Sequence, residues 1–161
     1  MIYTTTIASP VGEITLASNG ENLTGLWLAG QKYFGAGLPA LDNIAPDLPI
    51  FGTVRDWLAR YFNGENPPIG NLPLAPHGSS FRQNVWRALL DIPYGCTTTY
   101  GELARQIGCT AARAVGGAVG HNPISIIIPC HRVVGANGTL TGYAGGVDVK
   151  QRLLKLEANL Q

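Results

Sequence analysis

The sequence predicts an α+β fold in two parts, a small N-terminal antiparallel sheet domain with one helix and a mostly helical C-terminal domain. Three observations indicate this organisation. Strand-like segments separated by turn residues fill the first 28 positions, a stretch rich in proline spans residues 66–76, and helical spacings of apolar residues follow it. We therefore place a linker at residues 66–76, a support domain at residues 1–76 and a second domain at residues 77–161.

Three short segments rich in apolar and β-branched residues predict the strands of the sheet: residues 3–7, 13–17 and 23–28. A Ser9–Gly12 turn and an Asn19–Gly20 hairpin signal separate them. Residues 31–49 are irregular. After Thr53, apolar residues at helical spacing predict a helix that ends near Asn63 and covers the sheet. Its apolar face consists of Val54, Trp57, Leu58 and Tyr61.

Two capping signals open the C-terminal part. Ser80 is expected to cap a helix that ends before Pro93. Thr99 and Glu102 have the spacing of a capping box, which predicts a short helix that stops at Gly108. The apolar face of the first helix consists of Phe81, Val85, Ala88 and Leu89, and Trp86 is expected in the core.

A second short helix is predicted at once, over residues 111–119, with Thr110 as its cap. Two short helices around the Gly108 turn are typical of a helix-turn-helix. Alanine and glycine leave the second helix with almost no side-chain bulk, so its backbone can approach another surface closely. Tight packing against a neighbouring helix is the alternative. Arg113 is the one long cation on this helix, and a solvated surface charge is its alternative interpretation.

The last helix is expected to begin at Asp148, with Gln151 at capping-box spacing. Glu157 borders its apolar face, so we expect its carboxylate to be partly buried and paired with His131 or an arginine. A plain surface glutamate is the alternative. The apolar face consists of Val149, Leu153, Leu156 and Leu160.

The isoleucine run at residues 126–128 predicts a buried strand that delivers Cys130 and His131 to a turn. A thiolate is a strong nucleophile, and a neighbouring imidazole can act as the base that forms it. An ordinary core cysteine is the alternative. Arg132 weakens that alternative, because a charge in a core strand needs partners that offset its desolvation.

Composition and charge restrict the class of protein. The three cysteines, the absence of a signal-peptide pattern and the absence of an apolar run of about 20 residues predict a soluble, cytoplasmic protein without a membrane span. Residues 1–76 carry 3 basic and 6 acidic side chains, a net charge of −3, whereas residues 77–161 carry 8 and 4, a net charge of +4. The basic second half is a weak indication of a phosphate-bearing partner.

Five motifs together resemble the O6-alkylguanine-DNA alkyltransferase family, also called methylated-DNA–protein-cysteine methyltransferases. They are Thr99–Ala104, Ala111–Gly116, Asn122–Pro123, Ile128–Val133 and Thr141–Gly146. The first 76 residues are similar to this family in strand pattern only. The resemblance implies a ribonuclease H-like N-terminal domain and a winged-helix-like C-terminal domain with a helix-turn-helix.

The resemblance also implies a function. The chain would repair double-stranded DNA containing O6-alkylguanine by flipping out the base and moving its alkyl group irreversibly to Cys130, once per molecule and without a cofactor. His131 would act as the base through a water, Glu157 would orient His131, and Asn122 would tie the recognition segment to the active-site loop. The protein would act as a monomer in the minor groove and bind no metal.

The remaining site residues follow from the same resemblance. Arg113 would fill the gap left by the flipped base, while Tyr100 would rotate the phosphate and donate to guanine N3. Thr99 is also expected among the residues that bind the DNA or the substrate. The carbonyls of Cys130 and Val133 and the amide of Ala144 would contact the base. The expected pocket also includes Tyr143, Val119 and Ser125. Val119 and Ser125 replace larger or cyclic residues of some relatives, which leaves more room in the pocket.

Three other functions stay open from sequence alone. Alkyltransferase-like proteins recognise lesions but lack the acceptor cysteine, which Cys130 argues against. A cysteine hydrolase or redox enzyme would need a second histidine, and neither His77 nor His121 lies in a recognisable signature. A zinc site formed by the cysteines and His131 would have spacings unlike those of paired-ligand motifs.

Overall fold

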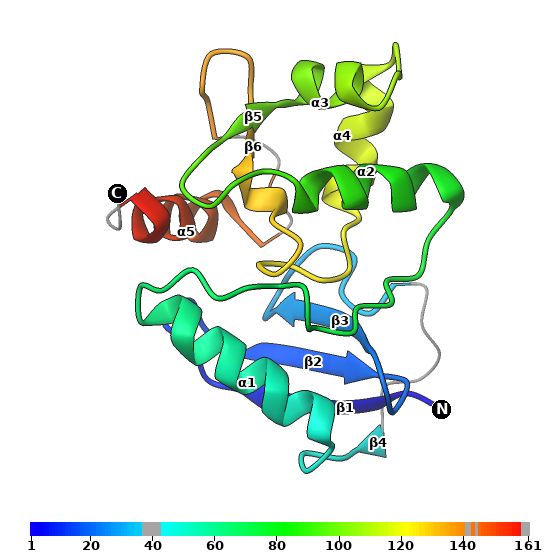
Figure 1. Ribbon diagram of the computed structural model, residues 1–161, viewed down its shortest axis with the longest axis vertical. Coiled ribbons are helices and arrows are strands. Elements are labelled where there is room, and N and C mark those ends of the chain that lie inside the picture. The colour runs from blue at the N-terminus through cyan, green and yellow to red at the C-terminus, as the bar shows by residue number, and fades with distance from the viewer. Residues whose placement is uncertain (37–42, 141–142, 144, 159–161) are drawn as a thin grey trace.

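The computed structural model of the chain describes residues 1–36, 43–140, 143 and 145–158. Figure 1 shows two stacked layers, with a sheet and one helix in the lower layer and a group of short helices in the upper layer. The segment that leads to Cys130, drawn in yellow, lies between them. This arrangement agrees with the predicted α+β class. No helix in the described ranges is long and apolar enough to cross a membrane.

The N-terminal sheet has the strand order β3-β2-β1-β4. The pairs β1–β2 and β2–β3 are antiparallel, as predicted, whereas β4 pairs with β1 in parallel. The short strand β4 lies within residues 31–49, so the prediction that this segment is entirely irregular was wrong. Pairing with the edge of β1 is enough to order such a short strand. A strand of two residues is too short to show an alternating pattern of apolar and polar residues in the sequence. The strands are β1 (Tyr3–Ile7), β2 (Ile14–Ser18), β3 (Leu23–Leu28) and β4 (Asn43–Ile44).

Helix α1 (Pro49–Phe62) covers one face of this sheet, as predicted (Figure 1). It begins before the predicted start at Thr53. Proline at the first helical position explains the difference, because its fixed φ suits the first turn and its missing N–H is not needed there. The buried face of α1 extends the predicted one at its N-terminal end and consists of Ile50, Phe51, Val54, Trp57, Leu58 and Tyr61.

The predicted linker runs along the edge of the sheet. The Leu23 amide donates to the Pro73 carbonyl at 2.8 Å, and the Ala75 amide donates back to the Leu23 carbonyl at 2.8 Å. The Trp57 indole Nε1 donates to the Pro68 carbonyl at 3.1 Å. The proline-rich segment is therefore fixed both to the sheet and to α1.

Within the described residues, the C-terminal part contains four α-helices and a two-stranded parallel sheet. Helices α3 and α4 pack against each other around Gly108, whose φ of 70° requires a residue that tolerates the left-handed region. This is the predicted helix-turn-helix. The elements are α2 (Ser80–Leu90), β5 (Thr98–Thr99), α3 (Tyr100–Gln106), α4 (Ala112–Gly120), the 3-10 turn η1 (Cys130–Arg132), β6 (Val133–Val134) and α5 (Val147–Ala158).

The predicted helix caps are only partly correct. The Thr99 side chain accepts from the Glu102 amide at 3.1 Å, which confirms the cap of α3. Ser79, not Ser80, caps α2 and accepts from the Arg82 amide at 3.2 Å. Two adjacent serines are equivalent as sequence signals, and only the extended backbone of the first one makes it the cap.

Two further predicted caps were wrong. Ala111 occupies the N-cap position of α4 without a side-chain bond, and Thr110 lies outside it. The Ala111 amide instead donates to the Cys109 sulfur at 3.4 Å. Asp148 lies within the first turn of α5 rather than before it, where its charge still interacts favourably with the helix dipole. The predicted apolar residue Leu160 lies outside the described residues.

The isoleucine run does not form the predicted strand. Ile126 has a φ of 71°, which breaks an extended conformation, and the run folds into consecutive turns. All three isoleucines are nevertheless buried. The preceding segment pairs with β3, because the Leu26 amide donates to the Pro123 carbonyl at 2.8 Å and the Ser125 amide donates to the Leu26 carbonyl at 3.0 Å. Buried strands and buried turns both require apolar residues, so the composition of this segment could not distinguish the two conformations.

A continuous hydrophobic core spans both halves of the chain. It joins the inner faces of the sheet and α1 to the isoleucine run and to buried faces of α2, α3, α4 and α5. The segment leading to Cys130 therefore has packed apolar residues on both sides. This packing fixes the position of the cysteine that follows it.

Candidate active site

Cys130 begins the 3-10 turn η1 and is only 5% exposed. Burial raises the pKa of its thiol to about 11, while Asn122 and the positive charge of Lys150 lower it in part. The resting sulfur is therefore a neutral thiol at physiological pH. A base near the site is needed before this sulfur can act as a nucleophile.

His131 and Glu157 form a fully buried pair beside this thiol. The His131 Nε2 lies 2.6 Å from Glu157 Oε2. Burial lowers the pKa of the imidazole, although Glu157 opposes the shift, so the ring is neutral near pH 7. Because an ionised carboxylate can only accept, Nε2 carries the ring proton and Nδ1 has the free lone pair. Nδ1 is buried and has no hydrogen-bond partner among the described residues. The predicted pairing of Glu157 with His131 is confirmed.

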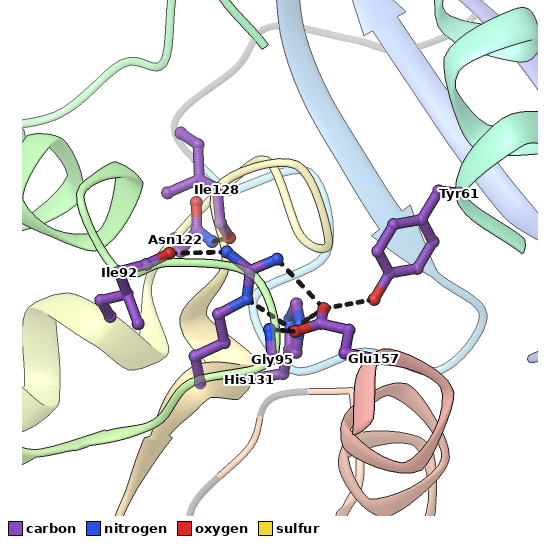
Figure 2. Close-up of polar contacts among 8 residues, drawn as sticks. Tyr61, Ile92, Gly95, Asn122, Ile128, His131 and Glu157 are labelled. Carbon is purple, nitrogen blue, oxygen red and sulfur yellow. Dashed lines mark hydrogen bonds and ion pairs between the residues drawn. The ribbon is translucent and has the colours of Figure 1, made fainter. Parts of the chain in front are cut away.

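The carboxylate of Glu157 is surrounded by donors (Figure 2). Arg132 donates Nε to Oε1 at 2.8 Å and Nη2 to Oε2 at 3.2 Å, and its Nη1 donates to the Ile92 carbonyl at 2.8 Å. The Gly95 amide donates to Oε1 at 3.4 Å, and the Tyr61 hydroxyl donates to Oε2 at 2.6 Å. Burial tends to raise the pKa of Glu157, but the contacts with His131 and Arg132 outweigh it and hold the pKa at about 2.

Asn122 connects the end of α4 to the segment before Cys130. Its Nδ2 donates to the Ile128 carbonyl at 2.8 Å and to the Ile124 carbonyl at 3.3 Å, and its Oδ1 accepts from the Ile124 amide at 3.0 Å. The side chain is 3% exposed. These bonds tie the end of α4 to the segment that leads to Cys130.

Lys150 is a site residue that the sequence analysis missed. It lies on α5 and is fully buried, and its Nζ donates to the Val133 carbonyl at 2.5 Å. Its charge and that of Cys130 influence each other, since each shifts the pKa of the other toward the charged form. The helical spacing could have indicated its burial, because Lys150 lies on the same face of α5 as Leu153 and Glu157.

The two carbonyls predicted to contact the base already have one donor each. The Val133 carbonyl accepts from Lys150, and the Cys130 carbonyl accepts from the Val133 amide in the 3-10 turn. A carbonyl oxygen has two lone pairs, so each can accept a second bond. Ala144, the third predicted contact, lies outside the described residues.

A cavity of about 250 Å³ opens beside α4 and includes Tyr143 in its wall. Its other lining residues are Lys32, Tyr33, Gly116, Gly117, Gly120 and His121. Tyr33 and His121 stack with ring centroids 3.8 Å apart, so a residue of the N-terminal half forms part of the wall. The volume is just below the usual range for small-molecule sites, about 300–1,000 Å³.

Tyr100 and Tyr143 lie near the thiol. Burial and the neighbouring Cys130 raise the pKa of both tyrosines, which are therefore neutral phenols that can donate. The Tyr143 hydroxyl is buried near Cys130 and Ser125 without completing a hydrogen bond of normal geometry to a described residue.

Ser125 and Val119 are both buried, at 1% and 5% exposure. The Ser125 hydroxyl donates to Gln31 Oε1 at 3.1 Å, and the same oxygen accepts from the Leu28 amide at 3.0 Å. Gln31 was also missed by the sequence analysis, because it begins a segment without a regular pattern. Its amide fixes the segment before Cys130 to the end of β3.

The exposed face of α4 agrees with the prediction of a slender helix. Ala112, Arg113, Ala114 and Gly117 are exposed, so Arg113 is the long side chain on an otherwise smooth surface. Gly116 faces the ring of Tyr100, and a Cβ there would lie 3.7 Å from it. Thr99 serves as the cap of α3. Within the described ranges, no group of three or more His, Cys, Asp or Glu side chains is placed to hold a metal ion.

Comparison with known proteins agrees with this geometry. Residues 2–76 match the family model described as 6-O-methylguanine DNA methyltransferase, ribonuclease-like domain, and residues 80–159 match that of the DNA binding domain. The methylated-DNA–protein-cysteine methyltransferase of Mycobacterium bovis is 51% identical over 158 residues, covering 98% of this chain and 93% of the relative. The Haemophilus influenzae protein of the same name is 48% identical and covers 97% of this chain and 86% of its own length.

A solved structure described as Mycobacterium tuberculosis OGT in complex with DNA superimposes with a TM-score of 0.84 at 47% identity, covering 98% of this chain and 94% of that one. A crystal structure of a variant of Mycobacterium tuberculosis OGT gives a TM-score of 0.87 at 47% identity, covering 100% of this chain and 95% of that one. Both halves of the chain match models of one family, and its relatives and the similar solved structures match it over nearly its whole length. This chain belongs to the 6-O-methylguanine DNA methyltransferase family.

Proposed function

We propose that this chain repairs DNA by moving the alkyl group from O6 of guanine to the sulfur of Cys130, once per molecule. The observation that carries the proposal is the buried pair of Glu157 and His131, next to Cys130 in the chain, in which an ionised carboxylate holds a neutral imidazole with Nδ1 free. Such a relay prepares one thiol for attack. The names of the relatives, methylated-DNA–protein-cysteine methyltransferases, describe a transfer to a cysteine of this kind.

The transfer balances without a cofactor. The Cys130 thiol proton passes through a water to His131 Nδ1, and the sulfur attacks the alkyl carbon. A carbon–sulfur bond forms while the carbon–oxygen bond breaks, and the electron pair of the broken bond stays on guanine. A proton donated at N3 by Tyr100 then restores a neutral base. The thioether has no leaving group that water could displace easily, so the protein is consumed.

The electrostatics of the site favour this order of events. Because the resting thiol has a pKa of about 11, Cys130 stays protonated until the substrate is bound and the base acts. Lys150 stabilises the developing thiolate through its charge, and Glu157 stabilises the imidazolium that forms on His131. The reactive anion is thus formed only where an alkyl group can capture it.

Helix α4 would bring the DNA to this site. Its exposed alanine and glycine surface suits a minor groove only about 6 Å wide, which a helix with larger side chains would have to widen much further. Flipping a nucleotide costs a few kcal/mol of stacking and pairing. Arg113 would occupy the vacated position, and Tyr100 would help rotate the phosphate. The protein would bind as a monomer.

The extruded guanine would enter the cavity beside Tyr143. The free lone pairs on the carbonyls of Cys130 and Val133 would accept from its amino group, and the amide of Ala144 would face O6. Val119 and Ser125 would border the bound base, and their small side chains would help set which alkyl groups fit.

The alternatives fit the site less well. A lesion-binding protein without transfer has no use for a buried thiol beside a neutral imidazole. A cysteine hydrolase needs water to release its intermediate, and a sulfur in a residue that is 5% exposed gives water little access. A zinc site finds no suitable cluster in the described part of the chain.

The decisive experiment is a mass measurement. The protein is incubated with duplex DNA containing O6-methylguanine, digested and weighed, and we expect one added methyl group on the peptide that contains Cys130. Cys130→Ser should gain none, whereas Cys96→Ser, which removes an exposed thiol, should be methylated normally. Repeated turnover without modification of the protein would instead indicate a hydrolase.

A further inference from the structure

The N-terminal half contributes a hydroxyl to the catalytic relay. Tyr61 lies near the end of α1, 96 residues before Glu157 in sequence, and its hydroxyl lies 2.6 Å from Glu157 Oε2. Figure 2 shows the Tyr61 ring reaching this carboxylate from the opposite side to His131. Both side chains are buried. The contact therefore joins the support domain directly to the group that orients the base.

The direction of this hydrogen bond is fixed by the protonation states. The pKa of Glu157 is about 2, so its oxygens can only accept. Burial and the charge of Glu157 raise the pKa of Tyr61 far above its usual value, so the phenol keeps its proton. Tyr61 therefore donates to the same oxygen, Oε2, that accepts from His131 Nε2.

We propose that Tyr61 is a positioning residue for alkyl transfer, acting on His131 through Glu157. Oε2 accepts from Tyr61 and His131 at 2.6 Å each and from Arg132 Nη2 at 3.2 Å, so its negative charge is shared among three donors. The share taken by the Tyr61 hydroxyl limits how strongly this oxygen holds the imidazole proton. The hydroxyl thereby keeps His131 neutral at physiological pH and holds the carboxylate in one orientation. This inference rests on the proposed alkyl transfer.

The surroundings of Tyr61 hold its ring in place. It stacks on Trp57 with centroids 5.4 Å apart and 10° between planes, and it meets Phe62 and Tyr94 edge to face. These contacts involve the ring and do not need the hydroxyl. A Tyr61→Phe substitution therefore removes the donor to Glu157 while leaving the aromatic packing in place.

Loss of this donor should have a definite effect on the relay. Without the Tyr61 hydroxyl, Oε2 carries more charge, the imidazolium form of His131 is better stabilised, and the pKa of His131 rises toward neutral pH. Less of the protein then has the neutral base. We expect the rate constant for transfer to fall about tenfold near pH 7, the effect of one hydrogen bond to a charged group. The acidic limb of the rate profile should move to higher pH.

The test measures single-turnover transfer from free O6-benzylguanine between pH 5 and 9 for wild-type protein, Tyr61→Phe and Tyr3→Phe. Tyr3 is a partly buried tyrosine of β1, a strand that β2 separates from β3, so its variant is the matched control. The final yield of alkylated Cys130 reports how much protein is folded and active. The rate constant reports the relay independently of that yield.

The expected result is a slower Tyr61→Phe with a shifted acidic limb, a normal Tyr3→Phe and no further loss when Tyr61→Phe is added to Glu157→Gln. An unshifted profile in Tyr61→Phe, or equal losses in both tyrosine variants, would overturn the inference and leave alkyl transfer standing. Failure of the wild-type protein to alkylate Cys130 with duplex DNA containing O6-methylguanine would instead overturn the proposed function itself.

Discussion

The Asn122 side chain donates to the Ile128 carbonyl at 2.8 Å, shortly before Cys130 in the chain. The same side chain also exchanges bonds with the backbone of Ile124, so one amide closes the loop between α4 and the 3-10 turn. The proposed DNA-contacting helix and the proposed nucleophile are thereby held by a single buried group. A displacement of α4 would therefore shift the 3-10 turn, and a displacement of the turn would shift α4.

Asn122→Ala tests this connection. The substitution leaves the buried Ile124 amide without its acceptor, while the Ile124 and Ile128 carbonyls lose one donor each but keep the Ile128 and Cys130 amides. We therefore expect a loss of about 1–3 kcal/mol in the free energy of unfolding and slower alkyl transfer. Urea denaturation and single-turnover assays measure the two effects. Asn71→Ala, at an exposed position, should change neither. Full stability in Asn122→Ala would show that the loop closes without this side chain.

Lys150→Met tests the charge behind the sulfur. Methionine keeps most of the buried volume but removes the positive charge that lowers the pKa of Cys130. That pKa should therefore rise further, and transfer near pH 7 should slow by about tenfold, as expected for a shift of about one pKa unit. The deficit should shrink as the pH is raised. Lys155→Met, on the exposed side of α5, is the control, and an equal loss in both variants would contradict the charge argument.

Arg113→Ala separates base flipping from chemistry. The residue is exposed on α4, so its removal should leave the rate of reaction with free O6-benzylguanine nearly unchanged. Repair of O6-methylguanine in duplex DNA should fall by at least about tenfold, because nothing then offsets the few kcal/mol that flipping costs. Arg105→Ala, also exposed but on α3, is the matched comparison. Equal losses on both substrates would exclude the proposed role.

Acid should destabilise the fold in two steps. The folded pKa of His131 lies below its ordinary 6.5, so the unfolded chain takes up a proton first and stability begins to fall below about pH 6.5. The folded pKa of Glu157, about 2, lies below its ordinary 4.5. Its contribution, about 3 kcal/mol, is present above pH 4.5 and lost between pH 4.5 and 2.

Urea denaturation from pH 7 to 3 measures this dependence. Glu157→Gln should be less stable at pH 7 and should lose less stability below pH 4.5, whereas Glu13→Gln, at an exposed position, should follow the wild type. A parallel decline in all three proteins would show that other groups control the acid response.

Helical and hairpin patterns predicted most of the fold. Strands β1 and β3 have the predicted bounds, because apolar patterning and turn residues act over a few positions and need no tertiary context. The cap at Thr99 is predictable for the same reason. The conformation of the isoleucine run was not predictable from such local patterns. Ile126 adopts a positive φ, which its side chain disfavours and which only the surrounding core stabilises.

The candidate site shows the same division. The pairing of Glu157 with His131 followed from a charge beside an apolar helix face, which needs a partner wherever it is buried. Lys150 and Tyr61 were missed as polar contributors, because a lysine in a helix is usually solvated and a core tyrosine is usually counted as apolar. Their partners lie in other elements, and only the packing of α1 and α5 around η1 brings these groups together.

Helix α4 does not supply its own rigidity. It has nine residues, with glycine at positions 116, 117 and 120, and no side-chain cap, so in isolation it would not be stable. The Trp86 indole on α2 donates to the Ala118 carbonyl at 2.9 Å and supports α4 on its buried side. A mutation of Trp86 should therefore be recorded in a screen as a DNA-binding defect, although the indole is buried. A search for residues that affect DNA binding would overlook Trp86 if it considered only exposed positions.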